Sequence, residues 1–518
     1  MPIMDRISRP FTAMLLALAC GGYATQADGA EYSPPGSNAA WRRYESANFE
    51  LFSAVSDPLS RELLHQLELL RHVVLENMEL PERRPTPVTV YYFKRDEDFR
   101  PYLPKQFANP DRVGGLYLSQ PDRAVILLPL AAQDDESGNV IFHEYVHHLM
   151  RVTEQNPPIW YNEGMAELFS TFQVRPSSLL IGKAPAGRVL ELQQTALLPL
   201  DQLLSATATS ALYRGSRHTG TLYAQSWALV HFCYLGVSPI PREKLRQFLR
   251  LARNPAVGNN PARINELCLQ ELGMDLEGLN QEIRRYIQGG RYQALRLDLP
   301  TIPGRTSYHA EAVPAATASL RLAELMIRTN RDPWAKIHVA QAVRDGSKDS
   351  RLQEVLGALA FVERDPRSAR EHWDQALALG SVNGALFHEL ALIESEDLFR
   401  QYDPYFRLPA ATADRLRLLL AKSIDRAPSQ SAAYEMLAWV EASSEKPDFA
   451  NLNRVQSQFP RLNDRQRTLL AIATARWRAG DTPGAQKLVE PLLGPAISPW
   501  TRHGAQVLQA VMTKSPPR

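Results

Sequence analysis

Apolar and polar positions follow two different periods along the first third of the chain. Short runs that alternate, or that are apolar throughout, predict strands, whereas residues 58–78 repeat apolar side chains at helical spacing. The strands are expected at residues 49–52, 87–93, 114–118 and 124–129. The last two runs flank the turn-like sequence Ser-Gln-Pro-Asp-Arg, which predicts a β-hairpin. The region from Trp41 to about Asp135 is therefore predicted to be mixed α/β.

The region that follows is predicted to be mostly helical. Residues 140–150 place an apolar stripe on one helix face, and the acidic residues 134–136 stand near the start, where the helix dipole favours negative charge. Two prolines at 157–158 end this helix, and a second helix is expected from about Ile159. Helical patterns then continue through residues 174–300.

A proline-rich linker leads into a region of different composition and periodicity. Beyond Ala315 the chain is rich in alanine, leucine and arginine, and small residues recur 34 residues apart. The recurring positions are Ala323, Ala335 and Ala342 in one copy and Gly357, Ala369 and Ala376 in the next, with Trp373 as a large residue between the last two. They resemble the small and large positions of a tetratricopeptide repeat, where two helices approach closely.

Later copies of this repeat are weaker. Two are expected at 432–460 and 468–493, with Ala450 and Ala485 as candidate small positions, and an irregular copy at 386–428 contains an insertion. Such helix pairs stack into a curved solenoid whose inner face commonly binds a peptide or protein. A protein partner is therefore expected on the repeats, and the alternative is that they only brace the rest of the chain.

The first residues have the pattern of an export signal. Arg6 and Arg9 precede an apolar run that is too short to span a bilayer, and small residues follow. The sequence before Cys20 approximates a lipoprotein signal, which leaves acylation of Cys20 as an alternative. A periplasmic or secreted protein is expected, in contact with a membrane only through lipid on Cys20. Cys233 and Cys268 then remain, either paired or as two buried thiols.

Composition and charge narrow the function classes. The 518 residues carry a formal net charge of +2 and are 44% hydrophobic, without a long block of like charges. Nucleic-acid binding is therefore not expected. The length gives room for roughly three or four domains.

One stretch carries the residues of a metal site. His143 and His147 lie four positions apart within the predicted helix 140–150, so both imidazoles face the same side. Glu144 stands beside them, where its carboxylate can take a proton from a zinc-bound water. Glu163 falls about one turn into the next helix, at a depth that suits a third ligand. Two His and one Glu would leave one zinc position open, as a catalytic site requires.

This pattern resembles a known family. His-Glu-x-x-His followed by Asn-Glu-Gly-x-Ala-Glu is similar to the gluzincin metallopeptidases, specifically the peptidase MA-like group, over residues 40–290. The resemblance implies that His143, His147 and Glu163 bind Zn²⁺ and that Glu144 is the general base. Fifteen residues separate His147 from Glu163, fewer than in thermolysin-type members. The resemblance also implies that the hairpin before the metal helix binds extended peptide by strand addition; a covered, structural hairpin is the alternative.

Other polar side chains near this pattern have less specific roles. Glu167, one turn beyond Glu163, either orients a ligand imidazole or is a solvated helix carboxylate. His148 points away from the two ligand histidines and is not expected to bind metal. A donor for a developing oxyanion would come from Tyr223, His218 or His231, among which the sequence does not choose, and packing roles are the alternative.

These observations predict an α+β zincin-like metallopeptidase domain, with a small mixed sheet and helices, followed by an all-α tetratricopeptide-like solenoid. The expected segments are 1–30 (signal peptide), 31–135 (α/β part of the peptidase domain), 136–300 (helical zinc-binding part), 301–315 (linker) and 316–518 (repeats). The expected activity is zinc-dependent hydrolysis of peptide bonds in the cell envelope. The alternative is an adaptor or assembly protein built on a non-catalytic peptidase-like scaffold.

Overall fold

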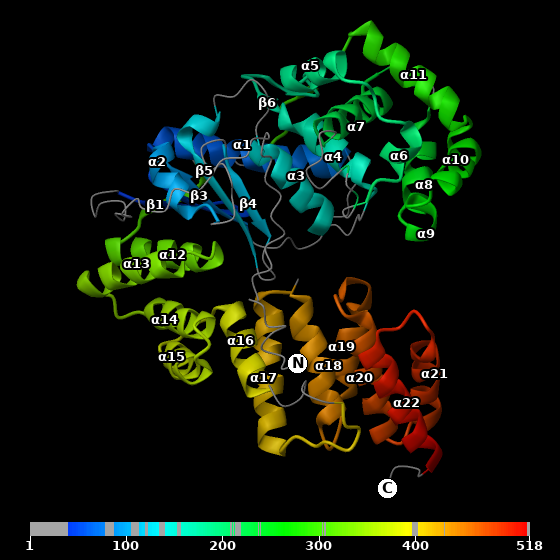
Figure 1. Cartoon of the computed structure of the whole chain (residues 1–518). Coiled ribbons are helices and arrows are strands. Elements are labelled where there is room, and N and C mark those ends of the chain that lie inside the picture. The colour runs from blue at the N-terminus through cyan, green and yellow to red at the C-terminus, as the bar shows by residue number, and fades with distance from the viewer. Residues whose placement is uncertain are drawn as a thin grey trace. The chain divides into compact units, whose positions relative to one another are not determined.

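The computed structural model divides the chain into two compact units, which we describe separately (Figure 1). Of the described residues, the N-terminal unit comprises 40–119 and 124–313 and contains the functional candidates, and the C-terminal unit comprises 314–514 together with Arg123. The structure describes residues 40–77, 88–104, 113–119, 123–133, 140–152, 157–207, 210, 212, 219–236, 238, 240–302, 304, 307–395, 402–428 and 430–514.

A six-stranded mixed sheet forms the centre of the N-terminal unit. Its order is β4-β5-β3-β2-β1-β9, with parallel pairing of β3 to both β2 and β5 and antiparallel pairing elsewhere. The strands are β1 (Arg42–Glu45), β2 (Phe49–Ser53), β3 (Val88–Phe93), β4 (Leu116–Ser119), β5 (Ala124–Pro129) and β9 (His309–Ala312). The predicted strands and the predicted hairpin are present, with ends that differ by one or two residues, as is usual for strand ends.

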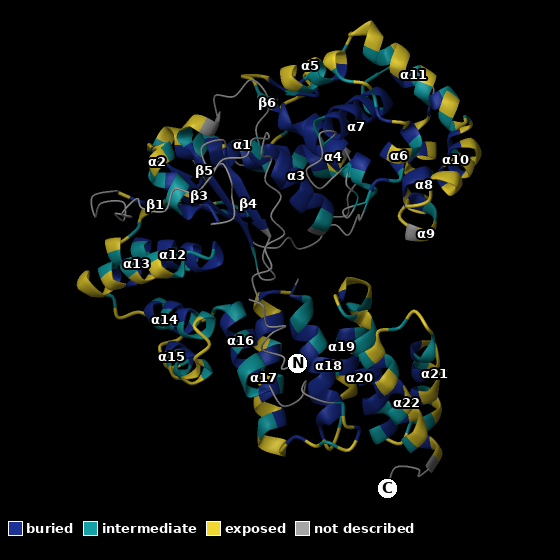
Figure 2. Ribbon diagram, viewed as in Figure 1, coloured by how far each residue is buried: buried dark blue, intermediate teal, exposed yellow. Residues whose placement is uncertain are grey.

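Helices cover both faces of this sheet. Helices α1 (Asp57–Asn77) and α3 (Val140–Val152) pack on one face, and α2 (Asp96–Phe99) with the short helix η2 (Arg100–Tyr102) packs on the other. Every residue of β3 is consequently buried, because apolar side chains meet it from both sides. Figure 2 shows the sheet and α3 as largely buried.

A helical layer continues the N-terminal unit beyond α3. Helix α4 (Ile159–Ser170) packs on both α3 and α7 (Thr219–Tyr234). A glycine at position 164 makes the second contact possible, since a methyl group there would overlap the Ser226 carbonyl oxygen and the Val230 side chain.

The remaining elements of this layer are a small antiparallel sheet in the order β6-β7-β8 and several helices. They are η4 (Leu130–Gln133), β6 (Gln173–Val174), β7 (Ser178–Ile181), α5 (Ala186–Gln194), α6 (Leu200–Leu204), α8 (Arg242–Ala252), α9 (Pro255–Gly258), α10 (Pro261–Leu267), the π-helix η5 (Cys268–Leu272), α11 (Leu276–Gly289) and β8 (Leu295–Asp298). Residues 174–300 are thus mostly helical, as predicted.

The predicted linker 301–315 is in part a structural element of the N-terminal unit. Strand β9 lies within it and pairs with β1 at the edge of the large sheet. The preceding Tyr308 is buried on α1, where its hydroxyl lies 3.1 Å from His65 Nδ1 and its carbonyl accepts a hydrogen bond from Arg61 at 2.8 Å. The pairing depends on a partner more than 250 positions away, so local composition did not indicate it.

The described part of the C-terminal unit is helical throughout. Successive helices form antiparallel pairs that are followed by a last single helix, and each pair packs on the next. The pairs are α12 (Ala315–Arg328) with α13 (Asp332–Arg344), α14 (Ser350–Val362) with α15 (Pro366–Ala378), α16 (Gly384–Glu394) with α17 (Ala410–Arg426), α18 (Ser431–Ser443) with α19 (Phe449–Ser457), and α20 (Arg465–Arg478) with α21 (Thr482–Val489), before α22 (Pro499–Lys514). Short 3-10 turns follow α19 (η8, Phe459–Arg461) and α21 (η9, Glu490–Leu493).

The predicted small positions mostly lie at contacts within these pairs. The alanines at 323, 335, 342, 369, 376 and 485 are fully buried. Gly357 lies against the Trp373 ring, which a larger side chain would overlap. Ala450 is the exception, because it is exposed and Leu452 and Val455 of α19 face the core instead.

Several of the sequence predictions fall on residues that the structure does not describe. The signal peptide, Cys20, the acidic residues 134–136 and His218 lie outside the described residues.

The two remaining cysteines are not paired. Cys233 and Cys268 are buried free thiols, and burial raises the pKa of each to about 12. Among the described residues, no helix combines the length and apolar character needed to cross a membrane.

Candidate metal centre

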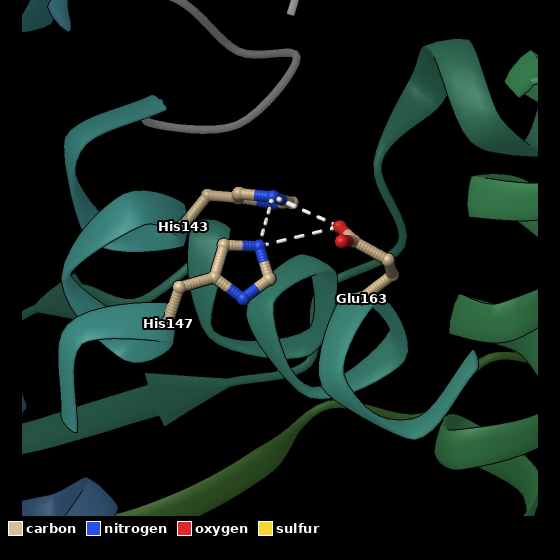
Figure 3. Close-up of side chains that lie close together, drawn as sticks. All are labelled: His143, His147 and Glu163. Carbon is tan, nitrogen blue, oxygen red and sulfur yellow. Dashed lines mark hydrogen bonds and ion pairs between the residues drawn. The ribbon is translucent and has the colours of Figure 1, made fainter. Parts of the chain in front are cut away.

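Helix α3 places two imidazoles side by side beneath the surface. His143 and His147 are one helical turn apart, and their Nε2 atoms lie 3.0 Å from each other. Both side chains are buried, because the large sheet and α4 pack on α3. The two nitrogens therefore point into one small space (Figure 3).

Helix α4 adds a carboxylate to the same space. Glu163 Oε2 lies 3.4 Å from His143 Nε2 and 3.2 Å from His147 Nε2, and its side chain is fully buried. The three residues can each offer one ligand atom, and these atoms lie within 4.8 Å of one another. Among the described residues, this is the only group of three or more histidine, cysteine or acidic side chains with such geometry.

The spacing of the three atoms fits a tetrahedral metal ion. Zinc with ligand bonds of about 2.05 Å would hold its ligand atoms about 3.3 Å apart. The observed separations are 3.0, 3.2 and 3.4 Å, so one ion at the centre of the three atoms would be within bonding distance of all of them. Two nitrogens and one oxygen also match the donor types that zinc prefers.

The electrostatics of the group favour opposite charges on His147 and Glu163. Burial alone would lower the pKa of His147, but attraction to the carboxylates of Glu163 and Glu144 outweighs it and raises the pKa to about 9. Burial opposes ionisation of Glu163, yet the two histidines hold its pKa well below the usual range. Without a metal the group would be a buried ion pair, and a cation in its place would release the imidazole proton.

Glu144 lies next to this group but makes no ligand contact with it. Its side chain is 3% exposed, and burial raises the pKa of the carboxyl above its ordinary value. The Oε2 atom of Glu144 has no hydrogen-bond partner among the described residues. A buried carboxylate oxygen of this kind is costly unless another group completes its surroundings, as water or substrate would.

A third carboxylate lies behind His143. Glu167 Oε1 is 3.4 Å from His143 Nδ1 and accepts a hydrogen bond of 2.6 Å from Arg188 Nη2. Glu167 is buried, so it is not a solvated helix carboxylate. The contact fixes the orientation of the His143 ring from the side opposite its Nε2 atom.

Arg188 was not identified from the sequence. It belongs to α5, and its guanidinium also stacks on the ring of Tyr223, with 5.2 Å between the guanidinium carbon and the ring centre. The surrounding Ala-Gly-Arg-Val sequence has no periodicity that distinguishes this arginine from a surface one. Only the folded chain brings it to Glu167.

The other three polar candidates, Tyr223, His231 and His148, contact different partners in the structure. The Tyr223 ring lies 6.2 Å from the His143 ring. His231 instead bonds to Tyr286 and to the Gly182 carbonyl oxygen, at 2.6 and 2.9 Å. His148 bonds to the Tyr117 hydroxyl at 2.9 Å, and burial lowers its pKa to about 3. Of these three side chains, only Tyr223 has a ring contact with a candidate ligand.

The chain matches no protein-family model, and comparisons with curated proteins and with solved structures find no similar protein. A functional interpretation therefore depends on the residues and their geometry.

Proposed function

We propose that this protein is a zinc-dependent metallopeptidase of the gluzincin type, with a zincin-like N-terminal unit and tetratricopeptide-like repeats. The observation that carries the proposal is the buried group of His143, His147 and Glu163, whose three ligand atoms have tetrahedral spacing. Three protein ligands leave room for a fourth, which distinguishes a catalytic zinc site from a closed structural one.

The chemistry would be hydrolysis of a peptide bond. Zinc, when bound, would polarise the scissile carbonyl and acidify a water molecule. Glu144 would accept the proton of the attacking water on its Oε2 atom and would later donate it to the leaving amine. Tyr223 is the hydroxyl donor best placed to stabilise the developing oxyanion, because its ring lies beside that of His143.

The edge strand β4 is the proposed site for extended substrate. It is an outer strand of the large sheet, and its one strand partner among the described residues is β5. Tyr117 of β4 bonds to His148, which neighbours His147 on α3. A peptide that pairs with β4 would therefore lie on the strand that is hydrogen-bonded to α3, the helix with the two histidine ligand candidates. Its side chains would be selected at alternate positions.

The experiment that tests the proposal compares zinc content with peptidase activity in matched variants. The unaltered full chain should hold one zinc ion and cleave peptides from an unbiased library. Glu163→Ala should lose both zinc and cleavage. Glu144→Gln should keep the zinc and lose about 10²- to 10⁴-fold in kcat, the usual contribution of a general base. Tyr223→Phe should also keep the zinc and lower kcat with little change in KM.

The outcomes separate the alternatives. Full zinc content in Glu163→Ala would refute the ligand assignment. Equal turnover by Glu144→Gln would refute the mechanism. Zinc in the unaltered chain without cleavage of any library peptide would favour the adaptor or assembly function, in which the helical repeats act and the metal unit is a scaffold.

A further inference from the structure

A pocket in the N-terminal unit lies beside the first hairpin of the large sheet. Its volume is about 750 Å³, which is within the usual range for small-molecule sites. Three segments line it: residues 45–48 between β1 and β2, one face of α1 between Glu68 and Glu76, and Ile302 with residues 307–309 before and at the start of β9. None of these described residues belongs to α3 or α4, so the pocket is separate from the candidate metal centre.

A buried arginine of α1 brings a positive charge to this pocket. Arg71 lines the pocket and is only 6% exposed. Its Nε atom is buried without a hydrogen-bond partner among the described residues, and no carboxylate in that part of the chain forms an ion pair with it. Arginine is rarely buried without a partner, because an uncompensated charge away from water is costly. The guanidinium therefore lacks an anionic partner, and the pocket gives such a partner access to it.

The nearest carboxylate on the same helix is already engaged. Glu68 lies one turn before Arg71, where two side chains of a helix can meet. However, Glu68 Oε1 accepts a hydrogen bond from the Asn48 backbone amide at 3.0 Å, and Oε2 accepts one from Asn48 Nδ2 at 2.7 Å. Both oxygens are thus used to hold the turn between β1 and β2. The carboxylate of a ligand would instead supply the two acceptor oxygens that match a planar guanidinium.

Other lining residues restrict which carboxylate can enter. The side chains of Glu45 and Glu76 are 54% and 66% exposed and stand at the rim. With histidine counted as neutral, the described lining holds three carboxylates and one guanidinium, which repels a ligand that is only anionic. An ammonium group on the same ligand would remove this repulsion. Leu75 and Ile302 add apolar surface, which suits an apolar side chain.

We propose that this pocket binds a small zwitterion, namely an amino acid or a short peptide with free ends and an apolar side chain. Its carboxylate would pair with Arg71, and its ammonium group would lie toward Glu45 and Glu76. The inference concerns a second site and does not rest on the proposed peptidase activity.

Calorimetric titration of the full chain tests this proposal. The probes are L-leucine and the dipeptide Leu-Leu, which should both bind. Leucinamide lacks the carboxylate and 4-methylpentanoate lacks the amino group, so each should bind at least about 10-fold more weakly than leucine. A chelator that removes metal should leave the affinity for leucine unchanged, which separates this site from the metal centre. Failure of both probes to bind, or equal affinity for leucine and leucinamide, would overturn the proposal.

A variant of Arg71 separates a binding role from a structural one. Arg71→Met removes the charge and keeps the apolar stem, so it should weaken leucine binding at least about 10-fold. The melting temperature should stay the same or rise, because a buried cation without a partner does not stabilise the fold. Arg285→Met, at an exposed position of α11, is the matched control and should bind leucine like the unaltered chain. A lower melting temperature of Arg71→Met with unchanged affinity would overturn the proposal.

A second variant covers the case in which Arg71→Met fails to fold. Ala47 is an exposed residue of the pocket lining, so a larger side chain there would fill part of the pocket without disturbing the core. Ala47→Trp should therefore weaken leucine binding and leave the melting temperature unchanged. Ala262→Trp, at an exposed position of α10, is its control and should change neither. Unchanged affinity of Ala47→Trp for leucine would show that leucine binds elsewhere and would refute the assignment of this pocket.

Discussion

At the scale of single residues, the candidate metal centre is supported by a series of polar contacts that runs from His143 to Glu167 and on to Arg188. His143 faces the other two ligand candidates with Nε2 and faces Glu167 with Nδ1, and Glu167 in turn accepts a bond from Arg188. A buried carboxylate that has lost its arginine would be costly, as would an arginine that has lost its carboxylate. The two residues therefore act together as positioning groups for the imidazole.

Glu167→Gln should weaken zinc binding about 10- to 100-fold, the usual cost of losing a carboxylate that orients a metal-bound imidazole. The amide keeps the shape of the side chain but removes the charge that stabilises the ring orientation. Competition with a chromophoric chelator measures the affinity. Glu243→Gln, at an exposed position of α8, is the matched control and should bind zinc like the unaltered chain. Equal affinity of the two variants would contradict the positioning role.

His231 gives the N-terminal unit a pH-dependent stability. Burial lowers its pKa from 6.5 to about 4, so the unfolded chain takes up the proton first as the pH falls. The stabilisation is complete above pH 6.5 and is lost progressively between about 6.5 and 4. From pH 7 to pH 5 this one group should cost about 2 kcal/mol of the free energy of unfolding.

Urea unfolding at the two pH values measures this effect. His231→Gln cannot take up a proton and should lose less stability than the unaltered chain on acidification, even if it is less stable at pH 7. The same pH dependence in both chains would show that His231 is not the group responsible.

At the scale of elements, the close contact of α4 with α7 sets the position of Glu163. The contact requires glycine at 164, because the Ser226 carbonyl is a backbone atom that cannot move aside easily. Packing against α7 thus explains the glycine of the Asn-Glu-Gly sequence. The glutamate before it is explained by its place in the candidate metal centre.

Gly164→Ala should destabilise the N-terminal unit by about 1–3 kcal/mol, the range for overpacking of a close contact. The displaced α4 should also hold Glu163 less well, so zinc affinity should fall together with stability. Denaturant unfolding and chelator competition measure the two effects. Gly187→Ala is the matched control, since an added methyl group there has nothing within 4 Å. Equal stability of both variants would show that α7 can move to accommodate the added methyl group.

Elements with a strong local pattern could be predicted from the sequence. Helices α3 and α4 and the strands β2 to β5 have periodic apolar positions or clear breaking residues, so their bounds agree with the structure to within a few residues. His143, His147 and Glu163 are close in the chain and lie on two consecutive helices that pack on each other.

Features that depend on distant partners could not be predicted. Strand β9 is only four residues long and mostly exposed, and alanines are its only apolar residues, so it is a strand only because β1 pairs with it. Arg188 looks like a surface arginine until α5 packs on α7, which brings its guanidinium to Glu167 of α4. Ala450 was wrongly predicted to lie at a helix contact. It has the size and about the spacing of a small repeat position, but it is exposed in the folded helix.

At the scale of the whole molecule, the boundary between the two compact units follows β9. The segment Ala124–Val313 belongs to the N-terminal unit and includes Tyr308, which is buried on α1. Arg43 in β1 bonds to Glu50 of β2 at 2.6 Å and to Glu311 of β9 at 3.0 Å, which ties the last strand to the first hairpin.

A truncated chain that ends at Val313 should fold and hold zinc like the full chain, whereas one that ends at Pro300 should be less stable by about 2–4 kcal/mol. The shorter chain lacks β9 and leaves the space of the Tyr308 ring unfilled, and loss of a buried side chain of this size has such a cost. Urea midpoints and zinc content compare the two. Equal midpoints would mean that β9 contributes little to the N-terminal unit.

The long separation between β1 and β9 also affects how the chain folds during synthesis. Arg43 and Glu311 are 268 positions apart, so one edge of the sheet stays open until nearly the whole N-terminal unit has left the ribosome. Contacts of such high sequence separation slow folding, and an unpaired strand edge can pair with other chains in the meantime. Nascent chains stalled before residue 309 should therefore depend on chaperones more than chains stalled after residue 313, and ribosome-bound chains of the two lengths can be compared by their aggregation.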